Sequence, residues 1–192
     1  MSLRNERNCS VMSSLQIWDS AVSQVTSEVP LNLDGGYLDP SSISVLVVDD
    51  YEPLRRFVCS TLQNDLELPT ILEASDGEEA VELAQALKPH LILLDIGIPK
   101  LNGIDAARRI RELSPQSKIL FFSQESSLDV VQEAFNAGAS GYVVKIDARE
   151  LTTAVRSVLR GESFIGRRFA GHTFTKASDV KIKSVQQCAH TT

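Results

Sequence analysis

Residues 44–53, SVLVVDDYEP, decide the fold class of this 192-residue chain. A short apolar run ends in Asp49 and Asp50, and Pro53 follows at a position that suits the first turn of a helix, where its missing N–H would have no partner anyway. An apolar run closed by polar residues and then by a helix start is typical of one βα unit in a buried parallel sheet. The stretch therefore predicts the first strand and the first helix of an α/β domain.

The same alternation repeats along the chain. Further apolar runs lie at residues 70–74, 91–94, 118–122 and 141–144, and amphipathic stretches lie at residues 53–65, 77–87, 103–113, 128–136 and 148–160. Strands that alternate with helices indicate βαβ units around a parallel sheet. We therefore predict five strands and five helices between residues 43 and 161.

Capping residues in the sequence also mark where the predicted helices begin and end. Asp76 and Asp147 precede helical stretches and are predicted N-caps, whereas Gly138 and Gly161 follow such stretches, where a left-handed C-cap is expected. In the last stretch the apolar residues recur at i, i+3, i+4, i+7 and i+8, which places them on one face toward the sheet. They are Leu151, Ala154, Val155, Val158 and Leu159.

The two flanks differ from the middle of the chain. Residues 1–42 are rich in Ser and Asn and are predicted to be a poorly ordered leader, although docking on a partner through Ile17 and Trp18 is an alternative. Residues 162–192 mix basic with polar residues, without apolar periodicity, and are predicted to be a disordered basic tail. Since this tail offers no set of amphipathic helices for a helix-turn-helix, direct DNA binding is not expected.

Composition sets further limits. The net charge of −6 argues against non-specific binding to nucleic acid or to an anionic membrane. Three scattered cysteines form neither a disulfide framework nor a zinc-like pattern. The chain has no secretory signal pattern and no apolar run near the roughly 20 residues that span a bilayer. We expect a cytoplasmic protein with one folded domain.

Polar residues directly follow four of the predicted strands. These residues are Asp49 with Asp50, Asp95, Ser123 and Lys145. Because ligands of open parallel sheets bind at the carboxyl ends of the strands, these side chains are expected to meet at one edge. Each alone could be a turn former, a helix cap or a solvated charge. Three acids, a hydroxyl and an ammonium at one edge point instead to a binding site.

Three close carboxylates repel one another unless a cation compensates. Mg²⁺ suits such a site because it takes carboxylates, water and phosphate oxygens in octahedral geometry. We predict Asp50 and Asp95 as direct ligands, Asp49 as a ligand through water, and the carbonyl of Gly97 as a backbone ligand. An aspartate in such a site can accept a phosphoryl group as an acyl phosphate. Charge neutralisation at the phosphoryl oxygens would then come from Lys145 and Mg²⁺.

The chain from about residue 43 to residue 161 resembles the receiver domain of two-component response regulators. The resemblance rests on residues 45–50 (VLVVDD), 93–99 (LLDIGIP), 122–123 (FS) and 138–145 (GASGYVVK). It is similar in particular to the receivers of NarL/FixJ/LuxR-type regulators. The resemblance implies a flavodoxin-like, doubly wound (βα)5 fold whose five parallel strands have the order 2-1-3-4-5.

The resemblance also implies roles for individual residues. Asp95 would be the phosphoacceptor, Asp49 and Asp50 the acidic pair, Lys145 the phosphate-binding lysine and Ser123 the hydroxyl switch. Tyr142 would be the aromatic that turns inward when Ser123 moves toward the phosphoryl group; the alternative is a strand aromatic that never switches. The implied partners are a sensor histidine kinase or a phosphotransfer protein, and then a downstream protein or a second copy of the chain.

Some positions depart from the family pattern, and other functions remain open. Gly97, Gln124 and Glu125 lie beside the expected site, and we hypothesise that they tune the lifetime of the phosphoryl group by controlling the access of water. The chain could be a stand-alone receiver, which is not an enzyme, or a shortened transcription regulator without its helix-turn-helix. A haloacid-dehalogenase-like phosphatase would need Asp-x-Asp after the first strand, and a flavodoxin-like cofactor binder would need a phosphate loop there without acids.

Overall fold

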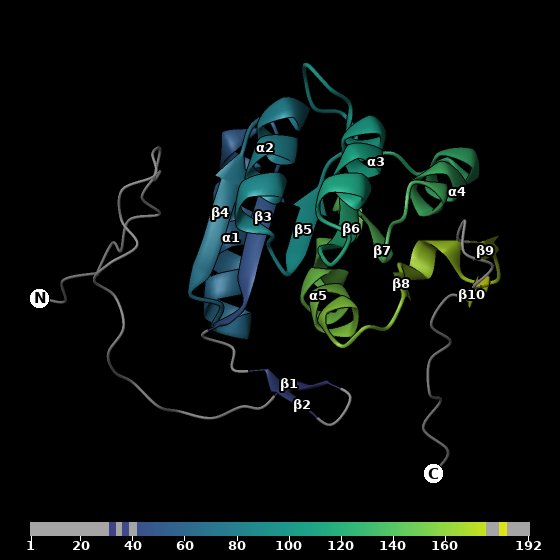
Figure 1. Cartoon of the computed structure of the whole chain (residues 1–192). Coiled ribbons are helices and arrows are strands. Elements are labelled where there is room, and N and C mark those ends of the chain that lie inside the picture. Colours follow the sequence, from purple (N-terminus) through teal and green to yellow (C-terminus); the bar gives the residue numbers. More distant parts are fainter. Residues whose placement is uncertain (1–30, 34–35, 39–41, 176–180, 184–192) are drawn as a thin grey trace, which may run out of the picture.

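The computed structural model describes residues 31–33, 36–38, 42–175 and 181–183. Its centre is a parallel sheet with the strand order β4-β3-β5-β6-β7-β8 (Figure 1). The strands are β3 (Ser44–Val48), β4 (Thr70–Ala74), β5 (Leu91–Leu94), β6 (Lys118–Ser123), β7 (Gly141–Val144) and β8 (Phe164–Ile165). The predicted flavodoxin-like α/β fold is confirmed, with its first five strands in the predicted order.

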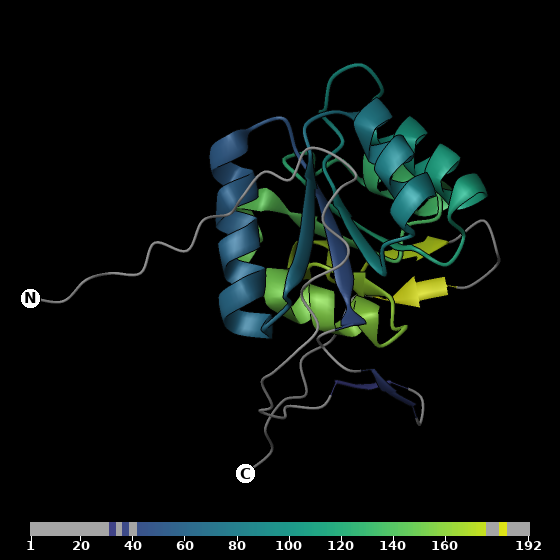
Figure 2. The same ribbon diagram turned by 60° about the vertical axis from the view of Figure 1, so that its left-hand side comes forward.

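Helices cover both faces of the sheet, as Figure 2 shows when the sheet is seen more nearly edge-on. α1 (Glu52–Leu66) and α5 (Leu151–Leu159) pack on one face, and α2 (Gly77–Leu87), α3 (Gly103–Leu113) and α4 (Leu128–Asn136) pack on the other. Strand residues alternate between the two cores: Leu46 and Val48 face α2 and α3, whereas Val45 and Val47 face α1 and α5. Because both faces are covered, the strands read as continuous apolar runs.

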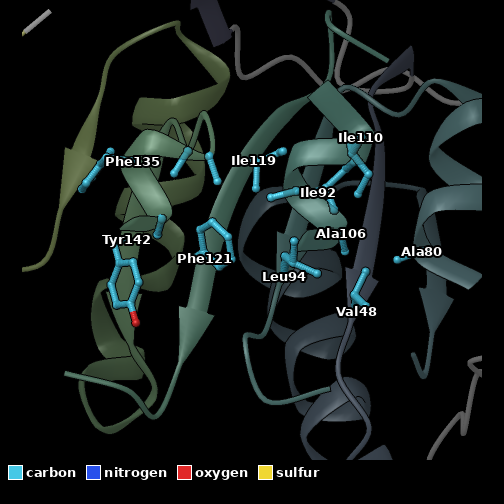
Figure 3. Packing of buried hydrophobic residues seen from close by; sticks show 14 of the residues in the cluster. Val48, Ala80, Ile92, Leu94, Ala106, Ile110, Ile119, Phe121, Phe135 and Tyr142 are labelled. Atoms are coloured by element: carbon cyan, nitrogen blue, oxygen red, sulfur yellow. The ribbon is translucent and has the colours of Figure 1, made fainter. Parts of the chain in front are cut away.

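The core beneath α2, α3 and α4 combines branched and aromatic residues of the strands with alanines and a few larger residues of the helices, such as Ile110 and Phe135 (Figure 3). Ala80 of α2 and Ala106 of α3 are fully buried against the sheet. The small helical side chains let the helices approach closely, while Phe121 and Tyr142 fill the space toward β7. Close packing on both faces fixes the strand ends that carry the polar residues.

The predicted helix boundaries hold in most places. Asp76 caps α2 by accepting a hydrogen bond from the backbone N–H of Glu79 at 2.9 Å. Gly138 and Gly161 have φ angles of 98° and 85°, the left-handed conformation expected of them. The prediction of an N-cap at Asp147 is wrong, because Asp147 lies inside a 3₁₀ segment, η2 (Lys145–Glu150), and α5 begins only at Leu151.

The predicted end of the domain at residue 161 is also wrong. The chain continues into β8, which adds a sixth parallel strand beside β7, and then into η3 (Arg167–Phe169) and β9 (Thr173–Thr175). β9 pairs in antiparallel fashion with β10 (Lys181–Lys183). β8 and β9 are too short to show a recognisable period. Buried aromatic residues that are widely spaced in the sequence hold this part of the chain against the domain. A disordered tail from residue 162 is therefore contradicted as far as residue 175.

Part of the predicted leader is described as well. β1 (Leu31–Leu33) and β2 (Gly36–Leu38) form an antiparallel pair where the sequence predicts poor order. Ile17 and Trp18, the contact residues of the alternative interpretation, lie outside the described residues with the rest of residues 1–30. The remainder of the predicted tail, at residues 176–180 and 184–192, lies outside them as well.

Candidate phosphoryl-acceptor site

Asp49 and Asp95 extend two neighbouring strands by one residue each. The N–H of Asp95 donates to the carbonyl of Val48 at 3.0 Å, and the N–H of Asp49 donates to the carbonyl of Ala74 at 3.2 Å. The sheet ladder thus holds both aspartates side by side at its carboxyl edge, where they are 4% and 7% exposed. Their positions come from the pairing of β3 with β5, two segments that are far apart in the sequence.

Three carboxylates converge at this edge. One oxygen from each of Asp49, Asp50 and Asp95 lies within 4.8 Å of the other two, and Asp50 is the exposed member of the group. Such a set of hard oxygen donors, open to solvent on one side, fits a magnesium ion that keeps some of its water ligands. The donor atoms of the site therefore fit the predicted magnesium ion. The exposed Gly97 follows in the loop, and a Cβ built on it would lie 3.9 Å from Asp95 Oδ2.

Lys145 bridges the two buried acids. Its Nζ lies 2.6 Å from Oδ2 of Asp49 and 2.6 Å from Oδ2 of Asp95. Burial alone would lower the pKa of Lys145, but the hydrogen bonds and charges of Asp49 and Asp95 outweigh it and raise the pKa above its ordinary value. The ammonium therefore stays charged, and it compensates only part of the charge of three carboxylates.

The remaining oxygens of the buried acids are held by the backbone. Oδ1 of Asp49 accepts from the N–H of Tyr51 at 2.9 Å, and Oδ1 of Asp95 accepts from the N–H of Ile96 at 2.7 Å. Each carboxylate is thus fixed through one oxygen while the other faces Lys145. This fixation orients Asp95 before any substrate arrives.

Arg55 supports the acidic pair from α1, a role that we did not predict from the sequence. Its Nη1 donates to the backbone carbonyl of Asp49 at 2.7 Å, and its Nε forms an ion pair with Glu73 at 3.2 Å. Together with Asp49 and Asp95 it lines a small cavity behind the site. The signal that could have shown it is a basic residue in the first turn of the helix that follows the acidic pair.

The loop that follows Asp95 is packed too tightly for side chains at two glycines. A Cβ on Gly103 would lie 2.0 Å from the carbonyl oxygen of Asp95, and a Cβ on Gly77 would lie 1.9 Å from that of Leu101. In addition, Nζ of Lys100 forms an ion pair with Oδ2 of Asp76 at 2.6 Å. The helix starts of α2 and α3 therefore clamp the loop that begins at the predicted acceptor.

Ser123 and Tyr142 form the other side of the site. Ser123 is 2% exposed at the end of β6, and its Oγ accepts from the N–H of Glu125 at 3.5 Å. The hydroxyl of Tyr142 donates to the carbonyl of Glu125 at 2.9 Å. Burial and the nearby charges of Glu125 and Asp95 raise the pKa of Tyr142, while a hydrogen bond with Ser123 lowers it; the net shift is upward. The two residues predicted to switch therefore both bond to the backbone of Glu125.

A model of the family described as "Response regulator receiver domain" matches residues 45–156, more than half of the chain and including every residue of the site described above. The chain belongs to this family. The predicted family is thereby confirmed, and the receiver is favoured over the phosphatase and the flavodoxin-like binder. Membership also places the chain in two-component systems.

Several relatives of this receiver are full-length transcription regulators. It is 35% identical over 129 residues to the transcriptional activator protein ExaE of Pseudomonas putida, covering 67% of this chain and 60% of that protein. It is 30% identical over 161 residues to the transcriptional regulatory protein DegU of Brevibacillus brevis, covering 78% of this chain and 68% of the relative. The receiver thus spans about two thirds or less of the curated relatives that it matches.

Solved structures agree with the fold. The signal receiver domain of the putative response regulator NarL from Mycobacterium tuberculosis has a TM-score of 0.60 and 30% identity, covering 64% of this chain and 100% of that one. A LuxR-family response regulator from an Aurantimonas species has a TM-score of 0.59 and 31% identity, covering 66% and 90%. Among the described residues, no helix of this receiver is long and apolar enough to cross a membrane.

Proposed function

We propose that this receiver is a phosphoryl-accepting switch in which Asp95 is the acceptor. The observation that carries the proposal is the convergence of Lys145 on Asp49 and Asp95, with Asp50 at the rim of the same pocket. The carboxylate of Asp95 is buried, which fixes its position. It lies beside the exposed Asp50, and a donor can approach from that side. Positioning and charge compensation are what phosphoryl transfer requires of a protein.

The reaction follows from the groups present. The carboxylate of Asp95 attacks the phosphorus of a phosphohistidine, or of a small phosphodonor, and the bond from phosphorus to the donor atom breaks as the acyl phosphate forms. Lys145 then pairs with the phosphoryl oxygens in place of the carboxylates of Asp49 and Asp95, which it bridges before the reaction. When bound by Asp49, Asp50, Asp95 and the carbonyl of Gly97, Mg²⁺ would supply a second positive charge at those oxygens.

The added charge then acts on the neighbouring strands. Ser123 moves toward the phosphoryl group as a hydroxyl donor, and Tyr142, bonded to the same loop, fills the space behind it. Two alternative arrangements of a packed core give a switch rather than a graded shift. The surface formed by α4, β7 and α5 changes, and a downstream protein or a second copy of the chain reads it. A histidine kinase or phosphotransfer protein is the donor, and a cytoplasmic location stays a prediction.

The proposal is tested by phosphoryl uptake from acetyl phosphate, followed by intact-mass spectrometry with Mg²⁺ and with a chelator. We expect the wild-type chain to gain one phosphoryl group only with Mg²⁺, and Asp95→Asn to gain none. Asp129→Asn is the matched control, because Asp129 is an exposed aspartate on α4. Uptake by Asp95→Asn at the wild-type level would contradict the proposal.

A further inference from the structure

Residues 164–175 fold back over α4 and β7 and carry two buried aromatic rings. Phe169 and Phe174 are 2% and 3% exposed. The ring of Phe169 stands edge-on to that of Tyr142, with 5.8 Å between centroids and 86° between planes, and Phe174 packs against Phe169 at 6.1 Å and against Phe135 of α4 at 5.7 Å. A continuous row of rings therefore joins Tyr142 to Phe135 of α4. We call residues 164–175 the C-terminal segment.

Two polar anchors hold the C-terminal segment at its ends. Glu150, 8% exposed at the end of η2, accepts from the backbone N–H of Arg167 at 3.0 Å and from its guanidinium at 2.6 Å. On α4, the side-chain amide of Gln132 donates to the carbonyl of Thr175 at 2.8 Å and accepts from its N–H at 3.3 Å. The amide of Gln132 thus bonds to both the N–H and the carbonyl of Thr175, as a neighbouring strand would. This makes the attachment specific.

Tyr142 connects this segment to the acceptor site. Its ring lies between Phe121 of β6 and Phe169, and its hydroxyl reaches the loop after Ser123 (Figure 3 shows Tyr142 beside Phe121). The ring is fully buried. To turn outward, it would have to leave the hydrogen bond to Glu125 and displace the edge of Phe169. A docked C-terminal segment packs against the ring in its inward orientation and thus favours that orientation.

We propose that the C-terminal segment is an intramolecular lock that holds Tyr142 inward, so that its docking and phosphorylation of Asp95 favour each other. The inference rests on the proposed function, in which Tyr142 turns inward as Ser123 moves toward the phosphoryl group. Because coupling is reciprocal, a docked segment strengthens phosphoryl binding and a bound phosphoryl group tightens docking. The segment covers part of α4, so its docking changes the α4 surface that a downstream protein or a second copy of the chain would read.

The test is a titration of the full chain with beryllofluoride and Mg²⁺, read by calorimetry, together with hydrogen exchange of residues 166–175. For the wild-type chain we expect beryllofluoride to slow exchange in the segment. Phe174→Ala removes the ring that joins Phe169 to α4, so it should speed exchange and weaken beryllofluoride binding by about fivefold or more, the low end of measured couplings. Gln132→Ala should act in the same direction without opening the core.

Thr173→Ala is the matched control, because Thr173 lies in β9 with an exposed side chain and should bind as the wild-type chain does. If the wild-type chain binds beryllofluoride, but Phe174→Ala and Gln132→Ala bind it equally well and exchange in the segment is indifferent to it, the lock is refuted while the proposed function stands. If the wild-type chain binds no beryllofluoride, the proposed function fails and the lock fails with it. Should Phe174→Ala not fold, Gln132→Ala alone decides.

Discussion

Ser123 and Tyr142 occupy adjacent strands and meet at the backbone of Glu125. Asp95 and Lys145 provide the chemistry in the proposal, whereas Ser123 and Tyr142 transmit it. The two pairs can be separated by experiment, because the carboxylate of Asp95 is held by the N–H of Ile96 and by Nζ of Lys145, and not by Ser123.

Ser123→Ala should separate acceptance from transmission. We expect its Mg²⁺-dependent phosphoryl uptake to persist, slowed by about tenfold at most, the cost of a lost hydrogen-bond donor. Its Tyr142 ring should no longer respond to phosphorylation, as followed by NMR of ring-labelled tyrosine. Ser123→Thr keeps the hydroxyl and should restore the response. A normal ring response in Ser123→Ala would remove Ser123 from the switch.

The acidic residues were predictable one by one because each directly follows a buried apolar run. Burial on both faces of a parallel sheet leaves little ambiguity about where a strand ends, and the carboxyl edge of such a sheet collects the residues at those ends. Arg55 and Glu150 could not be found in that way. Both bond to backbone groups outside their own element, Arg55 to that of Asp49 and Glu150 to that of Arg167, and these partners are set by packing that has no period in the sequence.

The loop between β5 and α3 depends on glycine at the helix start. Replacing Gly103 by alanine would place a methyl group 2.0 Å from the carbonyl oxygen of Asp95, so the loop or the helix must shift. We expect a loss of about 1–3 kcal/mol in the free energy of unfolding, the usual cost of overpacking, measured by urea denaturation. Phosphoryl uptake should also slow, because the acceptor moves.

Gly97→Ala is the matched comparison for stability. A Cβ there would meet only Asp95 Oδ2, at an ordinary 3.9 Å. Its free energy of unfolding should stay within about 0.5 kcal/mol of the wild-type value. Equal stabilities for the two alanine variants would show that the Gly103 contact is relieved at no cost.

The start of α2 gives a pH-dependent test. Burial would raise the pKa of Asp76, but the N–H of Glu79 and the ammonium of Lys100 lower it below its ordinary value of 3.8. A lowered folded-state pKa means that the carboxylate stabilises the fold above its unfolded pKa and that this stabilisation is lost as pH falls through the folded-state pKa. Asn keeps the cap without the charge, so Asp76→Asn should be less stable than the wild-type chain near neutral pH, by about 1 kcal/mol or less.

The difference between wild type and Asp76→Asn should shrink as the pH falls from about 5 to about 3, as measured by urea denaturation across that range. Asp76→Ala, which also loses the cap, should cost about 1–2 kcal/mol near neutral pH. A wild-type advantage that grows at acid pH would show that the charge of Asp76 does not stabilise the start of α2.

At the level of elements, the five longer strands and the helices between them followed from the alternation of apolar and amphipathic stretches. The sixth strand did not, because two residues cannot show a period. In addition, Phe164, Phe169 and Phe174 stand in a part of the sequence that is mostly polar. Their burial depends on β7 and α4, which present a face for them only after the domain has folded. The boundary of the domain was therefore placed too early.

The whole molecule brings together groups from four strand ends, and none of these segments could form the site alone. Asp49 and Asp50 come from β3, Asp95 from β5, Ser123 from β6 and Lys145 from the end of β7. The same sheet carries the C-terminal segment on β7, so the site and the segment share one rigid support. Whether the changed surface is read by another protein or by a second copy can be followed by sizing the chain with and without beryllofluoride.

The position of the phosphoryl group tests the central claim most directly. After incubation with acetyl phosphate and Mg²⁺, borohydride reduction converts an aspartyl phosphate to homoserine, and peptide mass spectrometry then locates it. The account predicts homoserine at residue 95 alone, with none when Mg²⁺ is withheld. Homoserine at Asp49 or Asp50, or an unmodified Asp95 in a chain that has taken up phosphoryl groups, would contradict it.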